Sequence, residues 1–74
     1  MGDKISTTIE DYLGVMYILE RDGEPIAGVR LAELLGVKPP TVTNTLKRMV
    51  RDNLISMDEN HHAHFTRYGR EAAY

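Results

Sequence analysis

The sequence predicts a small, mainly α-helical domain with one β-hairpin, an α+β arrangement in which a fourth helix begins after the hairpin. Three observations point to this fold class. Apolar residues recur at helical spacing in three segments, which are separated by short breaks containing glycine or asparagine. Two short alternating segments then flank a polar turn. A chain of 74 residues without cysteine has room for one domain and forms no disulfide.

The first predicted helix ends near Arg21 and begins at one of three competent N-caps, Ser6, Thr7 and Thr8. Glu10 lies three residues after Thr7, which is the spacing of a capping box. Gly23 is the expected C-terminal stop, and Pro25 follows it. One broad apolar face should be buried, consisting of Ile9, Tyr12, Leu13, Met16 and Tyr17.

The second predicted helix begins near Gly28, after Ile26 and Ala27, which are long enough for no more than a short edge strand. Its apolar stripe consists of Val29, Leu31, Ala32 and Leu35. Gly36 supplies the break after it, because glycine adopts the left-handed conformation that other residues resist. Val37 is expected to point back toward the core.

The third predicted helix starts at the sequence Lys38-Pro39-Pro40, because proline fits the first turn of a helix. Its buried stripe is Val42, Thr45, Leu46 and Met49, and it ends at Asp52-Asn53. The other faces of this helix carry small polar and basic residues. Two helices joined by a glycine-containing turn, the second with such residues, form the helix-turn-helix pattern and predict a DNA-binding module.

The predicted hairpin pairs residues 54–57 with residues 63–66 around a turn that is longer than two residues. Thr66 is a plausible N-cap for a last helical segment that begins at Arg67. A three-helix core followed by a hairpin and a helix is the order of a winged helix-turn-helix. In that fold the hairpin is a wing beside the DNA backbone, while the third helix enters the major groove.

The charge distribution supports the same interpretation, although the net charge is -2. Residues 28–51 hold five basic residues and one acidic residue, a local net charge of +4. Residues 1–27 hold two basic and six acidic residues, a local net charge of -4. Positive charge is therefore concentrated in the helix-turn-helix, where phosphates would be met.

Several function classes are disfavoured. No nucleophile–base pair, glycine-rich phosphate loop or paired carboxylates stand out, so we do not expect an enzyme. No apolar run approaches the roughly 18–20 residues that cross a bilayer, and there is no signal-peptide pattern. We expect a soluble, cytoplasmic protein with no membrane partner.

The order and identity of these segments resemble the N-terminal DNA-binding domain of the diphtheria toxin repressor family, whose members include iron- and manganese-dependent repressors. The landmarks are TTIEDYLGVMYIL at 7–19, VRLAELLGVKPPTVTNTLKRM at 29–49, DNLI at 52–55 and FTRYG at 65–69. The resemblance implies a metal-regulated transcriptional repressor that binds palindromic operators as a homodimer. We therefore interpret residues 1–74 as one winged-helix domain, the N-terminal part of a longer repressor whose dimerisation and metal-binding segment is absent.

The family's DNA-facing positions hold Lys38, Pro40, Thr41, Thr43 and Asn44 in this sequence. Lysine reaches phosphate or a guanine edge, asparagine pairs bidentately with adenine, and Pro40 and Thr41 are short enough to approach a thymine methyl. Three further residues are predicted to contact phosphates, namely Lys47, Arg48 and Arg51. The alternative is that all eight are ordinary solvated side chains on a surface helix.

The regulatory metal of the family is held between the first helix and a helix beyond the winged-helix domain. Asp11 stands where manganese-type members carry an aspartate and iron-type members a methionine, and a carboxylate suits Mn²⁺ or Fe²⁺. The companion glutamate, three residues later, is Gly14 here, and the remaining ligands would follow Tyr74. We expect no cofactor in this chain alone, and Mn²⁺ or Fe²⁺ in a full-length relative. Asp11 also has a simpler role, since an acidic residue near a helix N-terminus favours the helix dipole.

Three histidines lie in or beside the hairpin turn, His61, His62 and His64. Neighbouring histidines can bind Zn²⁺ or Ni²⁺, but no acidic or thiol partner lies at dependable ligand spacing. Partial protonation would instead ease the approach of the wing to phosphate at lower pH. We interpret this segment as a solvated wing tip.

Two other functions stay open at this point. One is a metal-independent winged-helix transcriptional regulator, and the other is a winged-helix protein-interaction module that contacts no DNA. A module of the latter kind usually lacks basic and small polar residues on its third helix, and this chain has them. A lone winged helix should bind DNA weakly and with strong salt dependence, because dimeric relatives combine two half-sites.

Overall fold

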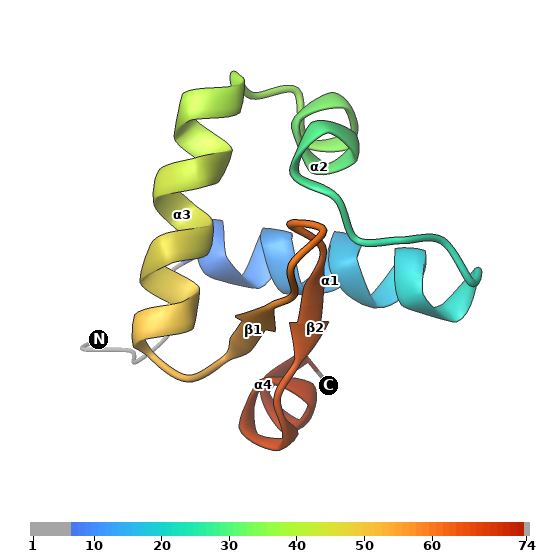
Figure 1. Cartoon of the computed structure of the whole chain (residues 1–74), viewed down its shortest axis with the longest axis vertical. Helices are drawn as coiled ribbons and strands as arrows, with labels where there is room; N and C mark the ends of the chain where they lie inside the picture. The colour runs from blue at the N-terminus through green and yellow to red at the C-terminus, as the bar shows by residue number, and fades with distance from the viewer. Residues whose placement is uncertain (1–6, 74) are drawn as a thin grey trace.

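The structure, a computed structural model, describes residues 7–73. Its elements are α1 (Thr7–Arg21), α2 (Gly28–Leu35), α3 (Pro39–Arg51), β1 (Ile55–Met57), β2 (Ala63–Phe65) and α4 (Arg67–Ala73). Helix α1 packs against both α2 and α4, and α3 packs against α2 and β1. In Figure 1, α1 passes behind the hairpin, α2 lies at the top, α3 runs down the left side, and α4 lies at the bottom. This arrangement confirms the predicted winged helix-turn-helix.

The core lies where α1, α2 and α3 meet the start of the hairpin. Its most deeply buried side chains are Leu13, Met16, Leu31, Val42, Met49 and Ile55. The predicted stripe of α3 is confirmed at all four positions, since Val42, Thr45, Leu46 and Met49 are buried. In α1 the predicted face is buried except for Tyr17, which is half-buried, and Leu19 joins the core as well.

The prediction that Val29 belongs to the buried stripe of α2 is wrong, because this side chain is 71% exposed. Leu31 sets the direction of the stripe, and a residue two positions earlier lies about 200° around the helix from it. Leu31 and Ala32 are buried and Leu35 is half-buried against the core, so the remaining three positions are confirmed. Val37 also packs against the core, as predicted.

Each of the three long helices ends with a residue in the left-handed conformation, at Gly23 (φ 75°), Gly36 (φ 68°) and Asn53 (φ 63°). In each case the next backbone N–H reaches the carbonyl five residues back. These hydrogen bonds join Glu24 to Leu19, Val37 to Ala32 and Leu54 to Met49, at 2.9–3.1 Å. They satisfy helix carbonyls that would otherwise lack a donor, and so fix the turns between elements. The predicted ends of all three helices are thereby confirmed.

The start of the first helix is less fully tested. Thr8 lies inside α1 and is no N-cap, whereas Ser6 lies outside the described residues. Thr7 is the first helical residue of α1, so the predicted capping box in which Thr7 is the N-cap is wrong.

The wing consists of β1 and β2 in antiparallel register, with Ile55 opposite Phe65 and Met57 opposite Ala63. The edge strand expected at residues 26–27 is reduced to a single bridge between Ala27 and His62. The Ala63 N–H also donates to the Ile26 carbonyl at 2.8 Å. The wing is therefore held against the segment that leads into α2.

Helix α4 is attached to the core at its first turn. Thr66 is its N-cap, as predicted, because the Gly69 N–H donates to Thr66 Oγ1 at 2.9 Å. The same hydroxyl lies 2.6 Å from the Asn53 carbonyl oxygen, to which it donates. Within the part of the chain that the structure describes, no helix is long and apolar enough to cross a bilayer.

Candidate nucleic-acid interface

Helix α3 has one buried side and three exposed ones. The N-cap residue Lys38 is extended (φ -81°, ψ 149°), and the two prolines that follow occupy the first two helical positions. All eight residues predicted to contact DNA are exposed: Lys38, Pro40, Thr41, Thr43, Asn44, Lys47, Arg48 and Arg51.

Helical geometry divides these residues further. At 3.6 residues per turn, Pro40, Asn44 and Arg51 lie directly opposite the buried stripe. Thr41 and Arg48 follow one flank, and Thr43 and Lys47 follow the other, beside the wing. A surface that meets a groove of DNA along α3 would therefore have Asn44 near its centre and basic residues on either side.

The basic side chains of α3 are mostly available for a ligand. Among residues 7–73, Lys38, Lys47 and Arg48 form no ion pair. Arg51 lies 3.3 Å from the carboxylate of Asp52, with the two side chains 69% and 50% exposed. An exposed pair of this kind is worth roughly 0–1 kcal/mol, so phosphate can replace its carboxylate at little cost.

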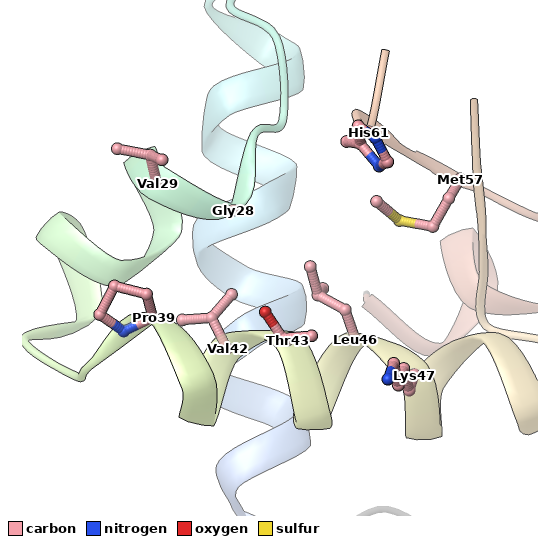
Figure 2. A pocket seen from close by; sticks show the side chains of 9 residues that line it. All are labelled: Gly28, Val29, Pro39, Val42, Thr43, Leu46, Lys47, Met57 and His61. Atoms are coloured by element: carbon pink, nitrogen blue, oxygen red, sulfur yellow. The ribbon is translucent and has the colours of Figure 1, made fainter. Parts of the chain in front are cut away.

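A groove of about 420 Å³ runs between the start of α2, the wing-side flank of α3 and the wing (Figure 2). Val29 lies at its α2 end, and Met57 and His61 line it from the wing. The hydroxyl of Thr43 points into it. Sequence reasoning missed the groove, because it depends on how the wing is placed beside α3.

The wing turn is organised by Asp58. Its Oδ1 accepts hydrogen bonds from the backbone N–H groups of Asn60 (2.8 Å) and His62 (3.0 Å). Its Oδ2 lies 2.7 Å from His64 Nε2. The hydrogen bond from His64, followed by those from the backbone, lowers the pKa of Asp58 from 3.8 to about 2. An aspartate at the start of a polar turn is the signal that could have identified this role.

The three histidines thus differ from the uniform solvated wing tip that the sequence predicted. His61 is exposed in the left-handed conformation (φ 63°), while His62 is half-buried and pairs with Ala27. His64 is exposed but bonded to Asp58.

Asp11 was the one predicted metal ligand, and it lies exposed on α1. Within residues 7–73, no three His, Cys, Asp or Glu side chains come together as a metal site would require. Position 14, where a second carboxylate would be needed, is an exposed glycine with open space around it.

Comparisons with known proteins agree with this geometry. Residues 4–63 match the family model described as iron dependent repressor, N-terminal DNA binding domain. The chain is 41% identical over 73 residues to the iron-dependent repressor IdeR of Mycobacterium leprae, covering 99% of this chain and 31% of the relative. It is 38% identical over 73 residues to the diphtheria toxin repressor of Corynebacterium jeikeium, and this match covers 99% of this chain and 30% of that relative.

Among solved structures, the chain resembles the manganese regulator SloR with a TM-score of 0.76 and 30% identity. That match covers 86% of this chain and 30% of the other. The chain thus spans less than a third of the length of these relatives, which are repressors or regulators by name and not enzymes. By sequence and by fold, the chain belongs to the iron-dependent repressor family and corresponds to its N-terminal DNA-binding domain.

Proposed function

We propose that this chain binds double-stranded DNA sequence-specifically through α3, as the DNA-binding domain of a metal-dependent transcriptional repressor. The observation that carries the proposal is the division of α3, whose predicted stripe of Val42, Thr45, Leu46 and Met49 is buried, while the eight positions predicted to contact DNA, on α3 and at its N-cap, are all exposed. A helix of this kind can enter the major groove without losing its contacts to the core.

The exposed residues have distinct roles in this proposal. Asn44 donates and accepts hydrogen bonds at an adenine edge, and Lys38 reaches a guanine edge or phosphate. Pro40 and Thr41 lie at the first turn, where short side chains approach a thymine methyl, with Thr43 on the wing-side flank. Phosphates are bound by Lys47, Arg48 and Arg51, which add affinity and salt dependence but little specificity.

Metal control belongs to the longer protein in this proposal. The relatives are named as iron-dependent repressors and a manganese regulator, whereas residues 7–73 form no metal site. Asp11 would contribute one carboxylate to a site completed by a segment beyond this chain. Dimerisation on a palindromic operator would likewise depend on that segment, and residues 1–74 would be one domain of the whole.

The test is selection of bound DNA from a random duplex pool, at low and at physiological salt, by the native chain and by Asn44→Ala. We expect the native chain to enrich one half-site, and Asn44→Ala to accept other bases at one position of it. A loss of roughly 1–3 kcal/mol in discrimination at that position is the size of one bidentate contact. Absence of any binding at low salt would instead favour a protein-interaction module.

A further inference from the structure

The groove beside α3 exposes apolar surface that the fold leaves uncovered. Its floor is formed by Val42 and Leu46, which are 1% and 7% exposed. At its two ends, Val29 is 71% exposed and Met57 is 38% exposed. Apolar side chains open to water at both ends of a concavity would be stabilised by a ligand that covers them.

Of residues 7–73, the one charged residue that lines the groove is basic. Lys47, Thr43 and His61 are among its lining residues, and no acidic residue in this range is. Lys47 forms no ion pair with any residue between 7 and 73, so its charge is not neutralised by the protein. A ligand with one negative charge complements this set.

The volume narrows the class of ligand. About 420 Å³ lies within the range of small-molecule sites, roughly 300–1,000 Å³, which are mostly apolar with a few placed polar groups. We propose that this groove binds a small organic anion. The apolar body of the anion would lie on Leu46 and Met57, and its carboxylate would meet Lys47 and Thr43.

A regulatory consequence follows, and it rests on the proposed function. Thr43 and Lys47 belong both to the groove and to the residues assigned to DNA. A bound anion and DNA would therefore compete for these two side chains, so that the anion lowers the apparent affinity for the operator.

The first experiment measures ligand binding without DNA. The ¹⁵N-labelled chain is titrated with 2-naphthoate and, as an uncharged analogue of similar size, with 2-naphthamide. We expect backbone shifts concentrated at Gly28, Thr43, Met57 and His61, and affinity for 2-naphthoate at least about fivefold higher than for 2-naphthamide, as one charge-assisted hydrogen bond provides.

Two matched pairs of variants place the site. Lys47→Gln should weaken 2-naphthoate binding about fivefold, while Arg48→Gln, which removes the same charge outside the groove, should change it less than about twofold. Met57→Glu puts a carboxylate among the lining groups and should abolish binding, whereas the uncharged Met57→Gln should retain it. Equal losses in Lys47→Gln and Arg48→Gln would show nonspecific attraction to α3 and overturn the proposal, as would absence of shifts at millimolar 2-naphthoate.

A second experiment tests competition by adding 2-naphthoate to the chain bound to fluorescent duplex DNA. Displacement by 2-naphthoate from the native chain but not from Met57→Glu supports the regulatory step. Binding of 2-naphthoate in the groove without displacement of DNA would overturn that step and leave DNA binding intact. A chain that binds 2-naphthoate but no DNA would refute the proposed function and leave the anion site standing.

Discussion

The guanidinium of Arg70 donates two hydrogen bonds to the carboxylate of Glu20, at 2.6 and 2.7 Å, and so joins α4 to α1 across 50 residues of sequence. The same guanidinium lies 5.3 Å from the centre of the Phe65 ring. The hydrogen bond from Arg70 is the main cause that lowers the pKa of Glu20 below 4.5. This contact holds α4 against α1.

Replacing Glu20 with glutamine should lower the free energy of unfolding by about 1 kcal/mol at neutral pH. The estimate is at the upper end for exposed ion pairs because the geometry is bidentate, and it is limited because water screens side chains that are 35% and 45% exposed. A carboxyl whose pKa is lowered by folding stabilises the fold above its unfolded pKa, and that stability is lost as the pH falls. The difference from the native chain should therefore shrink below pH 4.5.

Urea unfolding at neutral and acidic pH measures this effect. Arg67→Gln is the control on the same helix, because Arg67 is 96% exposed and lies 3.9 Å from its partner Glu71. If Glu20→Gln and Arg67→Gln lowered the free energy of unfolding equally, the contact between Glu20 and Arg70 would have no specific role.

Replacing Gly69 and replacing Gly14 with alanine should change the stability of the chain in opposite directions. A Cβ at Gly69 would clash with the backbone carbonyl of Leu54, so Gly69→Ala should force α4 away from the core and cost about 1–3 kcal/mol or more. A Cβ at Gly14 meets nothing within 4 Å. At this exposed helical position, Gly14→Ala should raise the free energy of unfolding by about 0.5–1 kcal/mol. Thermal unfolding of both variants measures the difference, and a stabilised Gly69→Ala variant would contradict the packing of α4.

The sequence was sufficient to predict the elements whose signals are local. Proline at the start of α3, the helix ends at Gly23, Gly36 and Asn53 and a five-residue turn between alternating segments each depend on a few neighbouring residues, and the structure has all of them. The buried stripe of α3 was also predictable, because Val42, Leu46 and Met49 repeat over more than one full turn. In the eight-residue α2, helical geometry could have excluded Val29 from the stripe, because this residue lies about 200° around the helix from Leu31 and is exposed.

Features that join distant segments could not be predicted from spacing. The hydrogen bonds between Arg70 and Glu20 depend on how α4 lies across α1, and the groove depends on how the wing stands beside α3. The exposed residues of α3 were predictable as a set, since they are what remains when the buried stripe is removed. Their individual roles toward DNA stay predictions.

Tyr12 presents a different kind of test. Its side chain is 2% exposed, and its hydroxyl has no hydrogen-bond partner among the residues that the structure describes. A buried hydroxyl without a partner costs roughly 1–3 kcal/mol, so Tyr12→Phe should retain or raise the stability of the chain. Tyr68→Phe, at a residue that is 49% exposed, should leave urea unfolding unchanged. Marked destabilisation by Tyr12→Phe would show that the hydroxyl is satisfied, for example by a buried water.

The wing turn should loosen in acid. Because folding lowers the pKa of Asp58 from 3.8 to about 2, its stabilising contribution is complete above the upper value and is lost as the pH falls through the lower one. Asp58→Ala should produce the same loosening at neutral pH, with faster hydrogen exchange at the Asn60 and His62 amides, which donate to this carboxylate. Glu59→Ala, at an exposed neighbour, is the control. Unchanged exchange in Asp58→Ala would mean that the strands alone hold the turn.

The salt dependence of DNA binding separates contacts to phosphate from contacts to bases. Each phosphate neutralised by Lys47 or Arg48 should contribute about 0.9 to the slope of log affinity against log salt concentration. Lys47→Gln combined with Arg48→Gln should therefore lower that slope by about two and weaken binding to all duplexes alike. Asn44→Ala carries no charge change and should leave the slope unchanged while it alters base preference. Arg67→Gln, on α4, should change neither quantity. If the slope stays constant in the double variant, Lys47 and Arg48 do not contact phosphates, and the role proposed for them is wrong.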